Sequence, residues 1–257
     1  MYKKGIDVSK WQGVIDWQRV RDAGIDFAML RAGFGQGNLD PCFARNADEC
    51  TRLGIPFGAY WFSYAYTPEM ARSEARFCAA ALAKYKLSYP VAFDFEYDSV
   101  DYASEQGVSV TKTLASELAR SFCGEIRAQG YYPMVYANPN YLSAYFDAEI
   151  PKEFDIWLAK WPRDPDPAVE PAESGGIWQY SSSGTVDGIA GRVDLNAAYK
   201  DYPALLGAKA PEGEYGSEAE RAREWCVSRG ISDGLRPLEA ATRQEVWVML
   251  YRMEGGK

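Results

Sequence analysis

Residues 91–98 read VAFDFEYD, an apolar, β-prone stretch that contains two acids. Such a composition predicts a buried strand, where an unpaired carboxylate is unfavourable because it loses its water. On a strand, residues i and i+2 point to the same face, so Asp94 and Glu96 are predicted to leave the sheet together, about 6.6 Å apart along the chain. The pair therefore indicates a functional site. The structural alternative is a buried ion pair with an arginine such as Arg31.

Strand-like stretches recur on both sides of this segment. They are 5–9 (GIDVS), 27–35 (FAMLRAGFG), 55–63 (IPFGAYWFS), 90–98 (PVAFDFEYD), 131–138 (YYPMVYAN), 154–161 (FDIWLAKW), 175–183 (GGIWQYSSS) and 191–199 (GRVDLNAAY). Helix-like stretches follow the first five, at 15–24, 41–54, 67–86, 109–130 and 138–146. Asp40 before Pro41 and Thr67 before Pro68 predict helix N-caps.

This alternation predicts an α/β fold. Five strand–helix units and three further strands without intervening helices total eight strands, and a mostly parallel sheet buries both faces by closing. We therefore expect an irregular TIM-like (β/α)5β3 barrel over residues 1–207, a linker at 208–216 and a small C-terminal helical hairpin at 217–257. The hairpin prediction rests on two capping boxes, Ser217 with Glu220 and Thr242 with Glu245.

Composition removes several classes of function. The 257-residue chain has a net charge of −8, which argues against nucleic acid because phosphates need Lys and Arg partners. No apolar run approaches the ~18 residues of a membrane helix, and MYKKGIDVSK enters a strand without a signal-peptide core. Five cysteines without CxxC spacing favour buried thiols over disulfides or zinc. The absence of histidine excludes Ser-His-Asp and Cys-His catalysis, so carboxylates are the leading candidates.

Four acids are predicted where a βα barrel does its chemistry, at the carboxyl ends of strands. They are Asp7 in the first strand, Asp94 and Glu96 in the fourth, and Asp194 in the last. The first and last strands of a closed barrel are neighbours, so Asp7 and Asp194 are expected to meet, opposite the central pair. Either aspartate alone is also typical of a cap or turn, but their agreement with the central pair favours a site.

Six segments between residues 3 and 206 form an ordered set of motifs: GIDVSKWQG, GAYWFSYA, VAFDFEYD, DIWLAKW, IWQYSS and VDLN. The set resembles that of the glycoside hydrolase family 25 lysozymes, the Chalaropsis-type N-acetylmuramidases. The resemblance implies a flattened barrel that needs no cofactor or metal. It also implies cleavage of the β-1,4 bond between N-acetylmuramic acid and N-acetylglucosamine in peptidoglycan.

By position, the resemblance makes Asp7, Asp94, Glu96 and Asp194 the catalytic acids, with Glu96 as the proton donor. Aromatic neighbours and other carboxylates raise a carboxyl pKa, which suits a general acid. Asp94 is expected to stabilise the oxocarbenium-like transition state or to orient the substrate's N-acetyl group. Retention and inversion both stay open, since an i,i+2 pair fits either carboxyl spacing. Substrate contacts are predicted at five aromatic residues, for which core packing is the alternative: Tyr60, Tyr64, Tyr136, Trp157 and Trp178.

Two segments depart from the family pattern or extend beyond it. Trp61 follows Tyr60 where the family commonly has histidine, and the fifth strand ends YANPN where Thr or Ser is frequent; both changes bear on sugar affinity. The segment EWCVSRGISDGLRPLEAATRQEVWVMLYRM resembles a single S-layer-homology-like repeat. That resemblance implies binding to the cell wall, with packing on the barrel or a homodimer through the hairpin as alternatives.

The sequence thus predicts a peptidoglycan hydrolase that acts at the bacterial cell wall, as a phage endolysin or a wall-remodelling enzyme. Bacterial peptidoglycan is the predicted partner. Alternatives are a non-catalytic peptidoglycan-binding protein, a chitinase-like glycosidase, and an enzyme whose four acids hold a hard cation.

Overall fold

The computed structural model describes residues 2–207 and Arg229. The chain divides into two units, Met1–Gly207 and Ala208–Lys257. The predicted linker, helical hairpin, S-layer-homology-like repeat and hairpin-mediated homodimer lie outside the described residues and stay predictions. Within the described residues, no helix has both the length and the apolar character needed to cross a bilayer.

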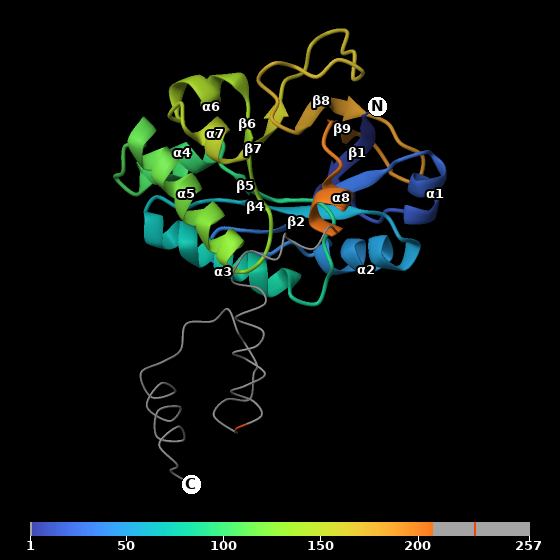
Figure 1. The fold of residues 1–257 in the computed structure, drawn as a ribbon, viewed down its shortest axis with the longest axis horizontal. Helices are drawn as coiled ribbons and strands as arrows, with labels where there is room; N and C mark the ends of the chain where they lie inside the picture. Colours follow the sequence, from blue (N-terminus) through green and yellow to red (C-terminus); the bar gives the residue numbers. More distant parts are fainter. Residues whose placement is uncertain (1, 208–228, 230–257) are drawn as a thin grey trace. The chain divides into compact units, whose positions relative to one another are not determined.

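Nine strands form one sheet at the centre of the first unit (Figure 1). They are β1 (Lys3–Val8), β2 (Phe27–Phe34), β3 (Asn38–Leu39), β4 (Phe57–Phe62), β5 (Val91–Asp94), β6 (Pro133–Ala137), β7 (Asp155–Ala159), β8 (Ile177–Gly184) and β9 (Val193–Ala198). Eight follow one another in the order β1-β9-β8-β7-β6-β5-β4-β2, and pairing of β1 with β2 closes the ring. The predicted closed barrel of eight strands is confirmed, and its finer class as a TIM-like (β/α)5β3 barrel stays a prediction.

The last strand runs against the others. Neighbours in the ring are parallel except for the two pairs that β9 makes, with β8 and with β1. The start of β9 therefore lies beside the carboxyl ends of the other strands. Asp194, the second residue of β9, reaches the barrel mouth for this reason. The sequence predicts it at the carboxyl end of a parallel strand, and that expectation is wrong.

Helices cover the outside of the barrel (Figure 1). They are η1 (Lys10–Gln12), α1 (Trp17–Asp22), α2 (Phe43–Leu53), α3 (Pro68–Leu82), α4 (Tyr97–Glu105), α5 (Lys112–Ala128), α6 (Pro139–Ala144), α7 (Ile150–Glu153) and α8 (Tyr202–Gly207). Thr67 caps α3 as predicted, since its hydroxyl accepts the Met70 N–H at 3.2 Å. Asp40 does not cap α2, which begins after Cys42.

The strand that carries Asp94 is shorter than predicted. β5 ends at Asp94, and α4 begins at Tyr97 with Glu96 as its N-cap residue. Glu96 keeps an extended backbone, with φ −125° and ψ −169°, and its N–H donates to Ser99 Oγ at 3.0 Å. This extended link beyond the strand still turns both carboxyl groups toward one cavity.

Side chains alternate between two apolar cores. Val91 and Phe93 point outward into the core beneath the helices, whereas Ala92 points into the barrel. The barrel interior is filled by a smaller cluster of Phe27, Met29, Tyr89, Ala92, Met134, Tyr136, Trp157, Ala159, Ile177, Ala198 and Tyr202. Asp94 has the same parity as Ala92 and therefore points inward.

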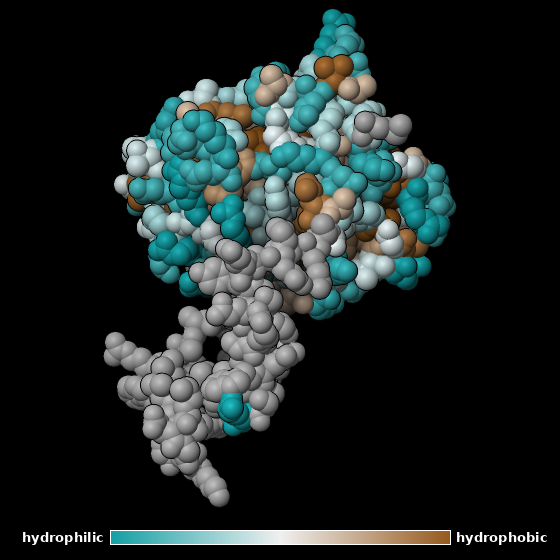
Figure 2. All heavy atoms as spheres, viewed as in Figure 1, coloured by the Kyte–Doolittle hydropathy of each residue, from teal (hydrophilic) through white to brown (hydrophobic). Residues whose placement is uncertain are grey.

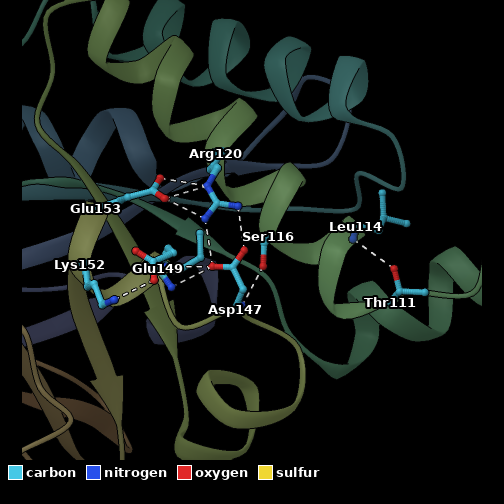
Figure 3. Close-up of polar contacts among 9 residues, drawn as sticks. Thr111, Leu114, Ser116, Arg120, Asp147, Glu149, Lys152 and Glu153 are labelled. Atoms are coloured by element: carbon cyan, nitrogen blue, oxygen red, sulfur yellow. Dashed lines mark hydrogen bonds and ion pairs between the residues drawn. The ribbon is translucent and has the colours of Figure 1, made fainter.

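Polar contacts fasten the outer helices to one another. Arg120 of α5 donates to Asp147 Oδ2 at 2.9 Å and to Glu153 Oε1 at 3.0 Å, which ties α5 to α7 ahead of β7 (Figure 3). The same guanidinium lowers the pKa of Asp147 to about 2. The face of the molecule in Figure 2 is mostly hydrophilic between small separate apolar patches.

Candidate active site

A cavity of about 190 Å³ opens where the carboxyl ends of the parallel strands meet. It is lined by residues from all eight barrel strands, the turn after β1 and the start of α4: Asp7, Val8, Ser9, Trp11, Gln12, Arg31, Tyr60, Phe62, Asp94, Glu96, Tyr136, Trp157, Gln179 and Asp194. The fold thus brings the four predicted acids together.

Asp7 and Asp194 face each other on neighbouring strands. They are direct partners in the antiparallel β1–β9 ladder, so their side chains share a face. Asp7 Oδ2 accepts hydrogen bonds from Gln179 Nε2 at 2.9 Å and Asn196 Nδ2 at 2.8 Å. Burial, and next the charge of Asp194, still raise the pKa of Asp7 well above its ordinary value. Burial also raises the pKa of Asp194.

Asp94 and Glu96 form the second pair of acids. Asp94 is 4% exposed, and its Oδ1 is buried without a hydrogen-bond partner. Burial raises the pKa of Asp94 well above its ordinary value, and the charge and hydrogen bond of Glu96 raise it further. Burial likewise raises the pKa of Glu96, which is partly exposed, whereas its hydrogen bond with Asp94 acts to lower that pKa. Two interacting like charges resist joint ionisation, so each carboxyl group of this pair favours a proton on the other.

Among the described residues, none of these four carboxyl groups forms a salt bridge. Arg31 lines the cavity, but its guanidinium pairs with buried Asp40 at 2.8 Å. The alternative that Arg31 is the ion-pair partner of Asp94 and Glu96 is therefore wrong. Buried acids without a direct counter-ion destabilise a fold, and such groups cluster at functional sites.

Three of the five predicted substrate contacts reach the cavity, namely Tyr60, Tyr136 and Trp157. Trp178 does not, because the alternation of β8 turns it into the outer core, where its indole N–H donates to Lys160 O at 2.7 Å. The Tyr64 ring also lies outside the cavity lining and packs on its aromatic neighbours Phe62 and Tyr102.

Gln179 occupies the inward position next to Trp178, and sequence reasoning missed it. Its Oε1 accepts hydrogen bonds from Tyr136 Oη and Trp161 Nε1, both at 3.1 Å. With both donors on the oxygen, the amide nitrogen must face Asp7, to which it donates. The alternation within IWQYSS is the signal that separates Gln179 from Trp178.

Asn196, which sequence reasoning also missed, connects the predicted residue Trp157 to Asp7. Its Oδ1 accepts the Trp157 indole N–H at 2.7 Å while its amide nitrogen donates to Asp7. Two side-chain amides thus fix one oxygen of Asp7. Within the described ranges, no grouping of Asp, Glu, Cys or His side chains has the arrangement needed to hold a metal ion.

A closed α/β barrel whose mouth gathers two pairs of carboxyl groups is typical of glycoside hydrolases, since glycosidic bonds are cleaved by such pairs. The sequence profile of Glycosyl hydrolases family 25 matches residues 6–189. The chain belongs to this family, as its motifs predicted.

Several relatives share this region. YegX of Escherichia coli (strain K12), an uncharacterized protein, is 32% identical over 203 residues, which are 75% of this chain and 68% of YegX. Lysozyme M1 of Streptomyces globisporus is 27% identical over 199 residues, covering 75% of this chain and 66% of that protein. The modular autolysin LytC of Streptococcus pneumoniae, solved with a synthetic peptidoglycan ligand, superposes with a TM-score of 0.66 at 29% identity, over 77% of this chain. The match spans 47% of the LytC chain, about half its length.

Proposed function

We propose that the chain is a lysozyme of the muramidase type. It hydrolyses the β-1,4 bond between N-acetylmuramic acid and N-acetylglucosamine in bacterial peptidoglycan. Family membership, the name of Lysozyme M1 and the peptidoglycan ligand of LytC support this substrate. The observation that carries the proposal is the gathering in one cavity of four acids that have no salt-bridge partner among the described residues: Asp7, Asp94, Glu96 and Asp194.

Glu96 is the proposed general acid. It is partly exposed, whereas Asp94 is 4% exposed, so Glu96 is the better placed of the two to reach a glycosidic oxygen. Its raised pKa favours the protonated form that a general acid needs. In the proposed reactive state Glu96 carries a proton and Asp94 carries the negative charge. That charge stabilises an oxocarbenium-like transition state or orients the N-acetyl group of the substrate.

The aspartate pair across the cavity supports this division of roles. The charge of Asp194 raises the pKa of Glu96, and the charge of Asp7 raises the pKa of Asp94. Both effects keep a proton on the central pair. We further propose that the product retains its anomeric configuration through attack by the N-acetyl group. Proton NMR of the product within minutes of cleavage checks this, because an inverted anomer would exclude that route.

The same chemistry fits a phage endolysin and a bacterial wall-remodelling enzyme, and in either case the protein acts at the cell wall. A non-catalytic peptidoglycan-binding protein and a chitinase-like glycosidase are the competing proposals. The first is disfavoured because all four acids are present and enclosed together. Chitin oligomers, tested as substrates beside peptidoglycan, separate the second.

Mass spectrometry of the soluble products from purified peptidoglycan tests the proposal. Wild type is expected to release muropeptides with N-acetylmuramic acid at the reducing end, and Glu96→Gln is expected to release almost none. Glu105→Gln, an exposed change on the same helix, is the matched control and should behave as wild type. Reducing-end N-acetylglucosamine would show that a different bond is cut. Wall binding without any release would favour the non-catalytic reading.

A further inference from the structure

The tryptophans of the described residues fall into two groups. Four are buried, at 4% exposure or less: Trp17, Trp61, Trp157 and Trp178. The other two, Trp11 and Trp161, are 76% and 56% exposed. An exposed indole presents a large apolar face with a polar N–H, and such a face can pack against a ligand. Both exposed tryptophans follow barrel strands at the end where the acid cavity opens.

Trp11 stands on the short η1 turn directly after β1. Its side chain lines the cavity, and Lys10 Nζ lies 4.6 Å from its ring centroid. The turn is held from both ends, because Ser9 N–H donates to Gln12 Oε1 at 2.9 Å and Trp11 N–H donates to Ser9 Oγ at 3.4 Å. The indole is therefore presented on fixed backbone, as a preorganised contact surface.

Trp161 lies two residues beyond the end of β7. Its indole N–H donates to Gln179 Oε1 at 3.1 Å, and the amide nitrogen of Gln179 donates to Asp7 at 2.9 Å. Gln179 is 3% exposed, so this chain of contacts leads from an exposed ring into the acid cavity. Trp161 is thereby held in place at the rim by the same amide that fixes Asp7.

The cavity itself is too small for a long substrate. Its volume of about 190 Å³ is below the roughly 300 Å³ at which drug-sized ligand pockets begin. A polymer bound across the acids must continue over the rim, where Trp11 and Trp161 lie after β1 and β7, three positions apart in the ring.

We infer that Trp11 and Trp161 are two further sugar-contact sites, which stack on pyranose rings of a β-1,4-linked N-acetylhexosamine chain beyond the pair of sugars whose bond is cut. This inference rests on the proposed function. It makes the two indoles determinants of substrate length, while the acids determine the chemistry.

Binding of defined glycans to the Glu96→Gln protein tests the inference without turnover. Titration calorimetry would compare a peptidoglycan disaccharide with a tetrasaccharide. Adding Trp11→Ala or Trp161→Ala is expected to weaken tetrasaccharide binding about tenfold. Disaccharide binding should fall by a smaller factor than tetrasaccharide binding, because the four acids are unchanged in both variants. Trp11→Phe and Trp161→Phe keep a ring and should stay within about threefold of the parent.

Leu205→Ala is the matched control, since this exposed residue lies on α8, whose Tyr202 contacts Asp155 at the opposite end of β7. Thermal melting confirms that each variant is folded. Unchanged tetrasaccharide binding in both folded alanine variants would overturn the inference and leave the muramidase proposal standing. If the parent binds neither glycan and wild type releases no product, the proposed function fails and the inference with it.

Discussion

The two ends of the barrel hold acids in opposite settings. At the start of β7, Asp155 accepts hydrogen bonds from Tyr132 Oη at 3.1 Å, Tyr202 Oη at 2.9 Å and Lys200 Nζ at 2.5 Å. Its charge is matched by a lysine and its oxygens are occupied. At the other end, Asp94 leaves one oxygen without a partner and has no salt bridge among the described residues.

The difference separates structural acids from those proposed to be catalytic within one barrel. A partnered carboxylate such as Asp155 holds strand and helix together, and removing it leaves its donors unsatisfied. A carboxyl group that is buried against another acid lowers stability, and a fold retains it where chemistry needs a raised pKa. Each of the following substitutions tests this difference between the two kinds of acid.

The largest effect is expected for Glu96→Gln. Loss of a general acid lowers the turnover rate by about 10²–10⁴-fold. The folded state should be as stable as wild type or more so, because one of two repelling acids becomes neutral. Rates of muropeptide release and urea unfolding curves measure the two quantities on the same preparation. A stable fold with full activity would remove Glu96 from the proposed role.

Asp155→Asn should show the reverse pattern. Its effect is a loss of about 2 kcal/mol in the free energy of unfolding, since the lysine and two phenols lose their charged acceptor. The turnover rate per folded molecule should stay within about twofold of wild type, because the cavity lies at the other end. Chemical denaturation and rate measurements check both parts. An activity loss in folded protein would contradict the separation of the two ends.

Glu74 of α3 is an intermediate case, buried with three donors and no cation among the described residues. Its carboxylate accepts Ser63 Oγ at 2.5 Å, Tyr64 N at 3.1 Å and Gln36 Nε2 at 3.2 Å. Burial nevertheless raises its pKa from 4.5 to about 7. The folded state therefore binds this proton more tightly than the unfolded state does.

The stability that Glu74 contributes is thus fully present below pH 4.5 and is lost as the pH rises through about 7. Glu74→Gln should flatten the pH dependence of the unfolding midpoint over that window. The acids of the cavity add a slope of the same sign, so the comparison is between variant and wild type. Identical slopes would mean that Glu74 does not titrate in this range.

The smallest effect is expected for Asp94→Asn on stability. Burial on folding raises the pKa of Asp94, which lowers the stability of the wild type at pH 7, whereas asparagine is neutral in both states. The variant should gain about 1 kcal/mol in the free energy of unfolding. Urea unfolding at pH 7 measures the difference. A loss of stability would show that Asp94 has a structural partner.

Much of this contrast follows from sequence, and the rest depends on contacts between distant segments. The eight strands and the meeting of Asp7 with Asp194 follow from apolar periodicity and closure. The direction of β9 does not follow, because apolar periodicity is the same for a parallel and an antiparallel strand. Trp178 was predicted as a substrate contact and Gln179 was missed, because both residues are buried and apolar character alone does not identify the inner face of β8. The pairing of Arg31 with Asp40 required the folded backbone.

The most direct test of the account is the rate of reducing-end release from purified peptidoglycan by Asp94→Asn and Asp155→Asn, each normalised to folded protein. The account predicts that Asp94→Asn is folded and almost inactive, while Asp155→Asn is less stable and active. Equal activity of the two variants, or an active Asp94→Asn, would contradict the claim that the acids at the barrel mouth, which form no salt bridge among the described residues, perform the chemistry.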